Sequence, residues 1–473
     1  MPLPTIPSGN VASQIPTGYD VTNSCLFEEA VMHKTPSSEG DTQKMTLSMW
    51  IKRQEIGVEN QIWHTQNSSN QATSLVFAGT DKLLFVSDDS NKLVTTRLFR
   101  DPSAWYHIVL AIDTTQGTAG NRAKLYINGV QETAFDTESQ PSEDQNLQWN
   151  KTTSHRIGSQ ADTANNAFNG MIAEFVWIDG TQYAASDFGE FDEDSPTIWK
   201  PKDPSALTFG TNGFYLDFEA SGNLGNDVNG GTDLTEVSIV AADQCRDTPT
   251  NNFSIMNRDM PLADGFAWEN ANTTFYNSSS AWESVFSNIG VTNGKWYFEM
   301  DIISVGNAGD GGGGCVVGIA DLDERATVTS AEKFTESGRT AYGYSSNGSK
   351  QTNGGSTGSW GATWNTNDII GCAFDLDNGK VYFSKNGTWQ DSGDPTSGAT
   401  GTGSAYNITT GVPYVAACGC HQDPQVAANF GGYDGGAFAV SSGNADDNGY
   451  GNFEYDVPAG YYAICTKNIA EFG

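Results

Sequence analysis

The chain has 473 residues, of which 57 are acidic and 24 are basic, so its formal net charge is −33. A protein this acidic repels nucleic acids and anionic membrane surfaces, because both need basic partners. Thirty-seven per cent hydrophobic residues with 53 glycines and 12 tryptophans indicate a turn-rich, all-β protein, long enough for two domains with separate cores.

Residues 1–20 contain four prolines together with glycine, serine and asparagine, a composition that predicts an extended N-terminal arm. The arm lacks the basic start and apolar run of a signal peptide, and no segment is apolar for long enough to insert in a membrane. We expect either a frayed terminus or a tether that anchors on a neighbouring subunit. The candidate anchoring residues are Pro4, Ile6, Pro7, Val11, Ile15 and Pro16.

Residues 21–243 are predicted to form the first domain, because most of their apolar segments alternate and so have one buried and one wet face. The strand at 105–113 is followed by alternation at 123–127 and an Asn128-Gly129 pair, which is a strong hairpin signal. Residues 186–206 are acidic and contain prolines, so we expect irregular chain or a single helical turn there. The other strands are predicted at 45–53, 74–79, 82–89, 170–180 and 213–218.

Alternation stops at about 241–262, where turn-forming residues predict a linker, and the second domain is predicted over 244–473. Within it, residues 368–389 are predicted to form a strand, an Asn-Gly turn, a second strand and a second Asn-Gly turn. The two tight turns set the register of a meander. Its other strands are predicted at 295–303, 315–321, 340–346, 413–420 and 426–432. The predicted fold class is therefore all-β, with two β-sandwich (jelly-roll) domains in tandem behind a short arm.

Catalytic patterns are weak in this sequence. Retaining glycoside hydrolases need two carboxyl groups about 5 Å apart. On a strand of the sandwich, the motif has carboxylates at three alternating positions. The nearest pattern here, Glu299-Met300-Asp301, has only two, because Ile303 holds the third position. There is no Gly-x-Ser-x-Gly elbow, and His107 lies on an apolar strand, where a satisfied core histidine is expected. We predict no catalytic residue and a protein that is not an enzyme.

The seven cysteines are an odd number spread through hydrophobic segments, which favours small buried side chains over a disulfide framework. Cys418-Gly-Cys420-His421 has the composition of half a metal site, but no second pair lies nearby in the sequence. We therefore predict no metal ligands there.

Calcium is the one ion that the acidic loops suggest, because hard cations bind several oxygen ligands on flexible backbone. The candidate ligands are Asp88 and Asp89 with Asn91, and Asp310 in a glycine-rich loop. No spacing resembles that of an EF-hand, so calcium stays possible and we assign neither calcium nor any other cofactor.

With catalysis disfavoured, binding through the loops at a sandwich rim is the function that remains. Sugars favour aromatic faces together with amide and carboxylate groups, so aromatic residues in or beside loops are the candidates, with core packing as the alternative for each. The candidate ligand-binding residues are Trp149, Trp360, Trp364 and Tyr344.

Two family resemblances follow from these blocks. The first domain resembles a concanavalin A-like, laminin-G-like jelly roll over about residues 24–220, through MTLSMWIKR, WYHIVLAID with KLYINGV, and FNGMIAEFVWIDG. The second resembles a SPRY domain over about residues 266–435, through GKWYFEMDI, VVGIADLD, AYGYSSNGSK, DIIGCAFDLDNGKVYFSKNGTW and PYVAACG.

The tandem itself resembles a group of virion proteins of tailed bacteriophages, through GYDVTNSCLF, RDPSAWYHIVLAIDTTQ, RDTPTNNFS and VPAGYYAICTKN. This resemblance implies a fibre or appendage subunit of the virion, made in the host cytoplasm and assembled with other virion proteins as a homo-oligomer, with a trimer favoured. Its rim loops would bind a host-surface glycan or protein. Two alternatives stay open: a capsid or tail decoration protein that contacts only virion subunits, and a glycan depolymerase.

Overall fold

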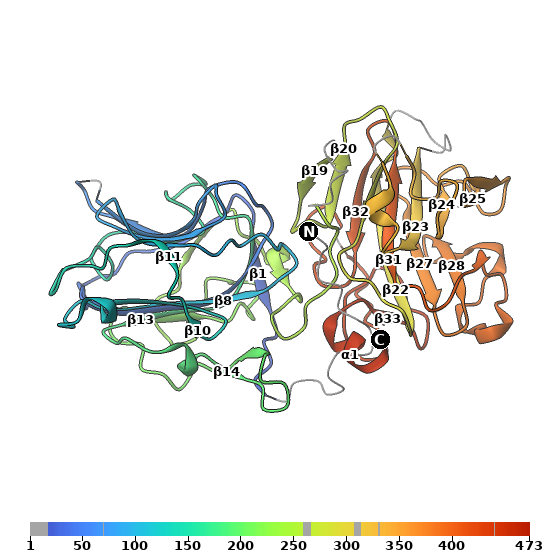
Figure 1. The fold of residues 1–473 in the computed structure, drawn as a ribbon. Helices are drawn as coiled ribbons and strands as arrows, with labels where there is room; N and C mark the ends of the chain where they lie inside the picture. Colours follow the sequence, from blue (N-terminus) through green and yellow to red (C-terminus); the bar gives the residue numbers. More distant parts are fainter. Residues whose placement is uncertain (1–17, 70, 259–265, 307–313, 330–331, 439) are drawn as a thin grey trace. The chain divides into compact units, whose positions relative to one another are not determined.

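The computed structural model describes residues 18–69, 71–258, 266–306, 314–329, 332–438 and 440–473. The chain forms two compact units that divide between Thr250 and Asn251, within the predicted linker (Figure 1). The first unit continues past residue 243, because Cys245 pairs with Ser24 in a sheet of that unit. The predicted anchoring residues Pro4, Ile6, Pro7, Val11, Ile15 and Pro16 lie outside the described residues.

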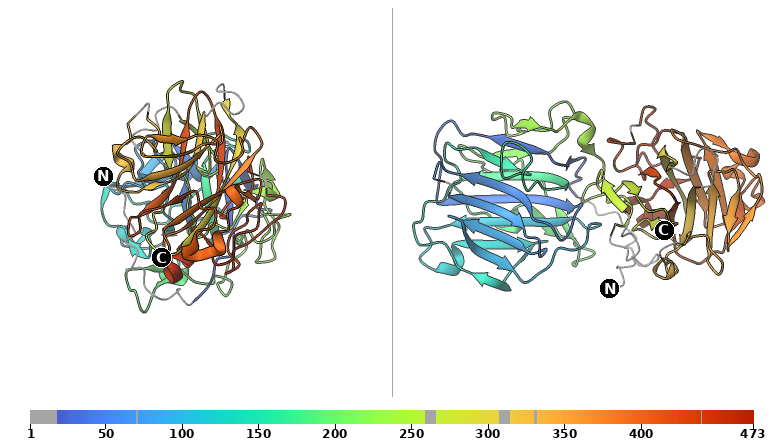
Figure 2. Two further views of the ribbon diagram at one scale, coloured as in Figure 1. Left: turned by 90° about the vertical axis from the view of Figure 1, so that its right-hand side faces the viewer. Right: turned by 90° about the horizontal axis from the view of Figure 1, so that it is seen from above.

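The first unit is a sandwich of two eight-stranded antiparallel sheets, and Figure 2 shows its strands lying side by side. The first sheet runs β10 (Val130–Gln131), β9 (Ala123–Ile127), β8 (Tyr106–Asp113), β3 (Lys44–Arg53), β13 (Gly170–Asp179), β1 (Ser24–Phe27) and β18 (Gln244–Cys245), and β16 (Phe214–Leu216) also pairs with β13. The second runs β11 (Phe135–Glu138), β7 (Ser90–Thr95), β6 (Leu83–Ser87), β5 (Ala72–Phe77), β4 (Asn60–Gln66), β12 (His155–Ile157), β2 (Val31–Lys34) and β17 (Thr235–Val237).

Alternation along these strands builds the core between the two sheets. On β3, Leu47, Met49 and Ile51 are fully buried and face the second sheet. Trp50 and the residues two positions away from it point to the opposite, outward face. The predicted hairpin is present, because Asn128 and Gly129 both adopt positive φ (48° and 77°) and connect β9 to β10.

The outward face of the first sheet is covered by chain from the same unit. Residues that follow β13 pack Phe188, Phe209 and Tyr215 against Val109 and Val176 of the sheet. Part of this cover is a two-stranded hairpin, β14 (Gly189–Phe191) with β15 (Trp199–Pro201), where the sequence predicted irregular chain. A helical turn is also present, as the 3₁₀ segment Ala185–Asp187.

The second unit is again two antiparallel sheets, with nine and six strands. The first runs β19 (Phe266–Glu269), β20 (Thr274–Asn277), β32 (Gln425–Asn429), β22 (Lys295–Ser304), β27 (Ile369–Asp375), β28 (Lys380–Lys385) and β29 (Thr388–Trp389), with β30 (Tyr406–Asn407) on β28 and β33 (Tyr462–Ala463) parallel to β22. The other runs β21 (Glu283–Phe286), β31 (Tyr414–Cys420), β23 (Cys315–Asp321), β24 (Ala341–Ser345), β25 (Lys350–Thr352) and β26 (Gly355–Thr357).

The predicted meander is present as β27, β28 and β29. Cys372 pairs with Phe383, and Ser384 pairs with Trp389 across the second turn. Asn386 and Gly387 both have positive φ, as a tight two-residue hairpin turn requires.

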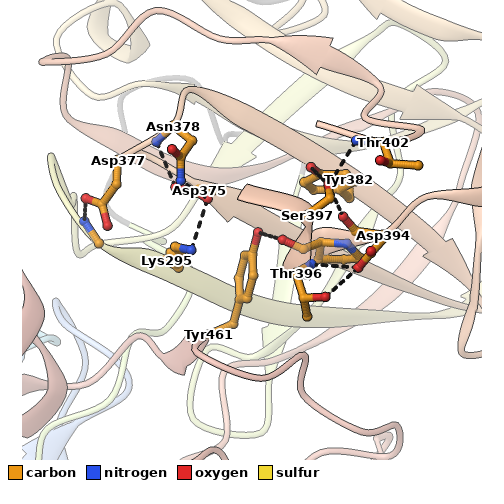
Figure 3. A network of polar contacts seen from close by, with 12 residues as sticks. Lys295, Asp375, Asp377, Asn378, Tyr382, Asp394, Thr396, Ser397, Thr402 and Tyr461 are labelled. Atoms are coloured by element: carbon orange, nitrogen blue, oxygen red, sulfur yellow. Dashed lines mark hydrogen bonds and ion pairs between the residues drawn. The ribbon is translucent and has the colours of Figure 1, made fainter. Parts of the chain in front are cut away.

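The C-terminal segment covers the outward face of the larger sheet in this unit. Figure 3 shows one contact that holds it, in which the Tyr461 hydroxyl donates to the carbonyl of Pro395 (2.9 Å). In the same view the Lys295 ammonium of β22 contacts the Asp375 carboxylate of β27 (3.3 Å), which links two strands of the sheet. The chain ends in α1 (Thr466–Phe472). Among the described residues, no helix combines the length and the apolar character needed to span a bilayer.

The remaining short elements are 3₁₀ turns at Ala119–Asn121, Ala241–Asp243, Arg325–Thr327, Gln390–Ser392 and Pro395–Thr400.

Candidate binding site

A small cleft opens at one edge of the first sandwich, where β9 and β10 of one sheet face β11 of the other. Its volume is about 140 Å³. Pockets that enclose drug-sized ligands measure roughly 300–1,000 Å³, so this cleft can receive no more than one small group, such as a single residue of a larger ligand. We call it the edge cleft, and it is lined by Gly120, Ala123, Lys124, Leu125, Gln131, Glu132, Thr133, Phe135, Glu138 and Gln140.

The chain builds the edge cleft by crossing from one sheet to the other within a few residues. After the Asn128-Gly129 turn, β10 pairs with β9, and the amide of Glu132 donates to the carbonyl of Leu125 (2.7 Å). The chain then enters β11, whose Phe135 pairs with Thr95 of β7. The cleft walls therefore come from both sheets, which hold them at a defined separation.

Several polar groups of the edge cleft are already engaged. The Gln140 side chain accepts from the amide of Ala123 (3.0 Å) and donates to its carbonyl (3.3 Å). Glu132 pairs with the guanidinium of Arg97 (2.9 Å). These contacts fix two walls of the cleft.

Other groups of the edge cleft are available to a ligand. Gln131 and Thr133 are exposed, and their side chains make no hydrogen bond within the described part of the chain. Phe135 is half-buried against the core and adds an apolar surface. An aromatic ring beside amide and hydroxyl groups is an arrangement that binds sugars.

Comparison with known proteins assigns the two sandwiches. The family model for the concanavalin A-like lectin/glucanase superfamily matches residues 30–184, and the SPRY domain model matches residues 295–432. The chain carries a concanavalin A-like domain and a SPRY domain. Both predicted domain types are thereby confirmed, as is the all-β class. No curated protein matches the chain in sequence.

Several solved structures align with part of the chain. The SPRY domain of human HERC1 is 16% identical, with 37% of this chain and 92% of that chain covered and a TM-score of 0.28. A suggested carbohydrate-binding protein from Bacteroides ovatus is 15% identical, covering 47% and 60%, with a TM-score of 0.33. A pentraxin from Limulus polyphemus is 15% identical, covering 35% and 80%, with a TM-score of 0.27. None of these matches points to a bacteriophage.

Three of the four predicted ligand-binding aromatics are core residues, so the prediction that their rings meet a ligand is wrong. Trp149 is 0% exposed in the concanavalin A-like domain and stacks near Phe85. Trp364 and Tyr344 are 0% exposed in the SPRY domain. Each lies beside polar residues in sequence but is drawn inward because a large ring gains more free energy buried than exposed.

Trp360 is the fourth predicted aromatic, and it is half-buried in the SPRY domain. Its ring packs edge-to-face on Tyr344, with centroids 5.4 Å apart, and the Lys350 ammonium lies 5.6 Å from its centroid. The same ammonium lies 4.9 Å from the Tyr406 ring and donates to the carbonyl of Ala405 (2.7 Å). A lysine of the chain thus occupies the space that a cationic ligand would take.

His107 is a satisfied histidine on the covered face of the concanavalin A-like domain, as predicted. The Trp199 indole N–H donates to Nδ1 (2.9 Å), so Nε2 carries the proton and donates to the Ser48 hydroxyl (2.9 Å). Burial lowers the pKa of His107 to about 3, which keeps the ring neutral. Trp50 stacks on it with centroids 4.8 Å apart.

Glu299 of the SPRY domain, the carboxylate weighed for catalysis, is buried and holds the covering segment. Its oxygens accept from the Tyr297 hydroxyl and from the backbone amides of Glu454 and Tyr455, each at 2.9 Å. Burial raises its pKa to about 7 against the lowering effect of these donors. Glu299 therefore has a structural role, because its oxygens already accept hydrogen bonds from donors of the chain.

The candidate calcium ligands that are described also hydrogen-bond within the chain. Asp88 accepts from the side chain of Gln145 (2.7 Å), and Asp89 accepts from the amide of Ala72 (3.0 Å). Asp310 lies outside the described residues.

The edge cleft was not predictable from the sequence, because its lining residues are ordinary surface types. Gln131, Thr133 and Gln140 belong to no motif, and Phe135 is a single aromatic in a polar stretch. The only available signal was the Asn128-Gly129 turn, which predicts the hairpin but not the strand that faces it.

Proposed function

We propose that the protein is a non-enzymatic binding protein whose concanavalin A-like domain receives a terminal sugar of a glycan in the edge cleft. The supporting observation is the pairing of the half-buried Phe135 ring with Gln131 and Thr133, whose side chains are available for hydrogen bonds. A sugar ring offers an apolar face to the phenyl group and hydroxyl groups to the amide and the threonine.

Charge narrows the class of glycan. The net charge of −33 repels sulfated and uronate-rich polysaccharides over the whole surface. Glu132 and Glu138 place two carboxylates in the cleft itself, and Lys124 is its one basic lining residue. The proposal is therefore a neutral glycan, bound through one terminal residue.

The test is a glycan array probed with the full-length protein, followed by calorimetric titration with the best neutral glycan. Phe135→Ala and Thr133→Ala should each weaken binding about tenfold, equivalent to about 1.4 kcal/mol. Val130→Ser is the matched control, because Val130 is 56% exposed on the same hairpin and does not line the cleft. Unchanged affinity of Phe135→Ala, or no glycan bound, would overturn the proposal.

The depolymerase alternative is tested in the same tubes by assaying reducing-sugar release. Glu132 and Glu138 both line the edge cleft, so a two-carboxylate mechanism has residues to draw on. Release that Glu138→Gln abolishes would make the protein an enzyme and overturn the non-enzymatic part of the proposal.

From the resemblance of the tandem sequence alone, we further propose a fibre or appendage subunit of a tailed-phage virion, oligomeric and anchored through residues 1–20. Three measurements test this: mass spectrometry of purified particles, native mass of the protein, with a trimer expected, and host-cell binding with and without residues 1–20. Host binding that survives loss of the arm supports an adhesin with a separate anchor. Presence in particles without host binding would favour the decoration protein.

A further inference from the structure

Three cysteines that are far apart in sequence converge in the core of the SPRY domain. Cys418 and Cys420 alternate along β31, and Cys315 of β23 lies opposite Cys420 in the antiparallel register. Directly opposed residues share a face of the sheet, so all three thiols point into the sandwich. The Sγ atoms of Cys315 and Cys418 are 3.7 Å apart, and those of Cys418 and Cys420 are 3.8 Å apart.

These three residues, the thiol trio, are the one cluster in the described part of the chain whose ligand atoms could share a metal ion. Their Sγ atoms all lie within 4.8 Å of one another. All three residues are 0% exposed, and none forms a disulfide.

The spacing of the thiol trio fits a thiolate site. Two sulfurs bound to one tetrahedral zinc ion at 2.3 Å are separated by about 3.8 Å. Two thiols that merely pack together can lie at the same distance, so one such pair does not indicate a metal site. Three sulfurs that are all close to one another can form one face of a tetrahedron, and this number is what indicates a site. An all-sulfur set selects soft ions over calcium or magnesium.

Charge favours a divalent ion over a monovalent one. Three thiolates and a 2+ ion leave one net negative charge in the core, whereas a 1+ ion leaves two, and buried net charge is unfavourable. The carboxylate-bearing residue nearest in register is Glu283 of β21, which lies opposite Cys420 on its other side. Its carboxylate does not belong to the cluster, so the three sulfurs are the ligands that this chain supplies.

The position of the thiol trio provides a route for the ion. Cys315 is the first residue of β23 and Cys420 is the last of β31. The amide of His421 donates to the carbonyl of Gly314 (2.8 Å) and closes this end of the strands. Strand ends open locally at a lower free energy than strand centres, so an ion can reach the sulfurs without global unfolding.

We propose that Cys315, Cys418 and Cys420 form a binding site for a soft divalent metal ion of the Zn²⁺ class. The site belongs to the SPRY domain and is independent of the edge cleft.

The experiment titrates the reduced full-length protein with Zn²⁺ against a chromophoric chelator, and with Cd²⁺ while recording the sulfur-to-metal charge-transfer absorption. We expect one ion per chain and a charge-transfer band. Each of Cys315→Ala, Cys418→Ala and Cys420→Ala should weaken Zn²⁺ binding at least tenfold and reduce the band. Cys372→Ala is the matched control, because Cys372 is equally buried in the same core cluster but outside the trio.

Intact mass and circular dichroism establish that each variant is folded and reduced. Binding that equals the wild type in Cys418→Ala, or an absent charge-transfer band in folded wild type, would overturn the proposal. A loss of two hydrogens from the wild-type mass on exposure to air, with no metal bound to the reduced form, would also overturn it and assign the trio to disulfide chemistry.

Discussion

Glu174 in the concanavalin A-like domain should make the stability of that domain fall as the pH rises. The residue lies at a bulge in β13, with φ of 51°, and its side chain is buried. One carboxylate oxygen accepts from the Tyr215 hydroxyl (2.6 Å) and the Tyr19 hydroxyl (3.2 Å). Burial, the largest effect, raises the pKa of Glu174 from 4.5 to about 8.

The sign and size follow from proton linkage. Between pH 4.5 and about 8 the folded protein keeps a proton on Glu174 that the unfolded chain has released. The stabilisation from that proton is complete below pH 4.5 and is lost as the pH rises through about 8. At about 1.36 kcal/mol for each pKa unit, the loss from pH 5 to pH 8 is about 3 kcal/mol.

Glu174→Gln removes the charge and keeps one oxygen to accept from both tyrosines, so its free energy of unfolding should lack this decline. The assay is urea unfolding of the full chain at pH 5 to 8, read by pulse proteolysis, with peptides from residues 18–250 counted by mass spectrometry. Glu193→Gln, an exposed substitution in the same domain, is the control and should behave as wild type. Equal pH dependence in wild type and Glu174→Gln, or a wild type that gains stability with pH, would refute the reasoning.

Three other substitutions probe the contacts described above, and a fourth, at Gly57, is a control for the first. Gly129→Ala should lower the free energy of unfolding by about 2–4 kcal/mol, because its Cβ would lie 2.2 Å from the Trp199 ring at φ of +77°. Gly57→Ala, with φ of +76° and open space around it, should cost only about 1 kcal/mol in the same urea titration. Trp199→Phe removes the donor to His107 and should cost about 1 kcal/mol, while nitrogen chemical shifts should show a neutral His107 ring in wild type from pH 5 to 8. Glu299→Ala removes the acceptor of the buried Tyr297 hydroxyl and of two partly buried backbone amides, and should cost about 3 kcal/mol. Hydrogen exchange at the amides of residues 454 and 455 should become faster, and unchanged exchange there would contradict the assigned role.

Strands rich in apolar residues were predictable, and a buried strand rich in polar residues was not. All the predicted strands are present, including β3 and β13, which are buried on both faces along nearly their whole length. β4, with the sequence NQIWHTQ, was missed, since six of its seven residues are buried, polar ones included. One of its buried polar side chains, His64, pairs through Nδ1 with the Ser74 hydroxyl of the neighbouring strand (2.8 Å).

Predictions from local sequence were also wrong where a side chain packs against residues that are distant along the chain. Trp149 lies in EDQNLQWNK, which has the composition of a loop, yet its ring enters the core. The 189–201 hairpin was predicted as irregular chain. It forms where the Trp199 ring packs so closely over Gly129 and Gly189 that a Cβ at either would lie within 2.5 Å of the ring.

The sequence by itself determined the all-β class and the Asn-Gly hairpins, because alternation and turn chemistry act between near neighbours in the chain, and its resemblance to known families indicated both domain types. Tertiary structure alone decided which aromatics are buried, that β9 of one sheet and Phe135 of the other line the same cleft, and that Cys315 joins Cys418 and Cys420. These features depend on strand pairing over long separations, about a hundred residues for the cysteines. Strand pairing at that range is selected by the burial of whole sheets and leaves no local pattern in the sequence.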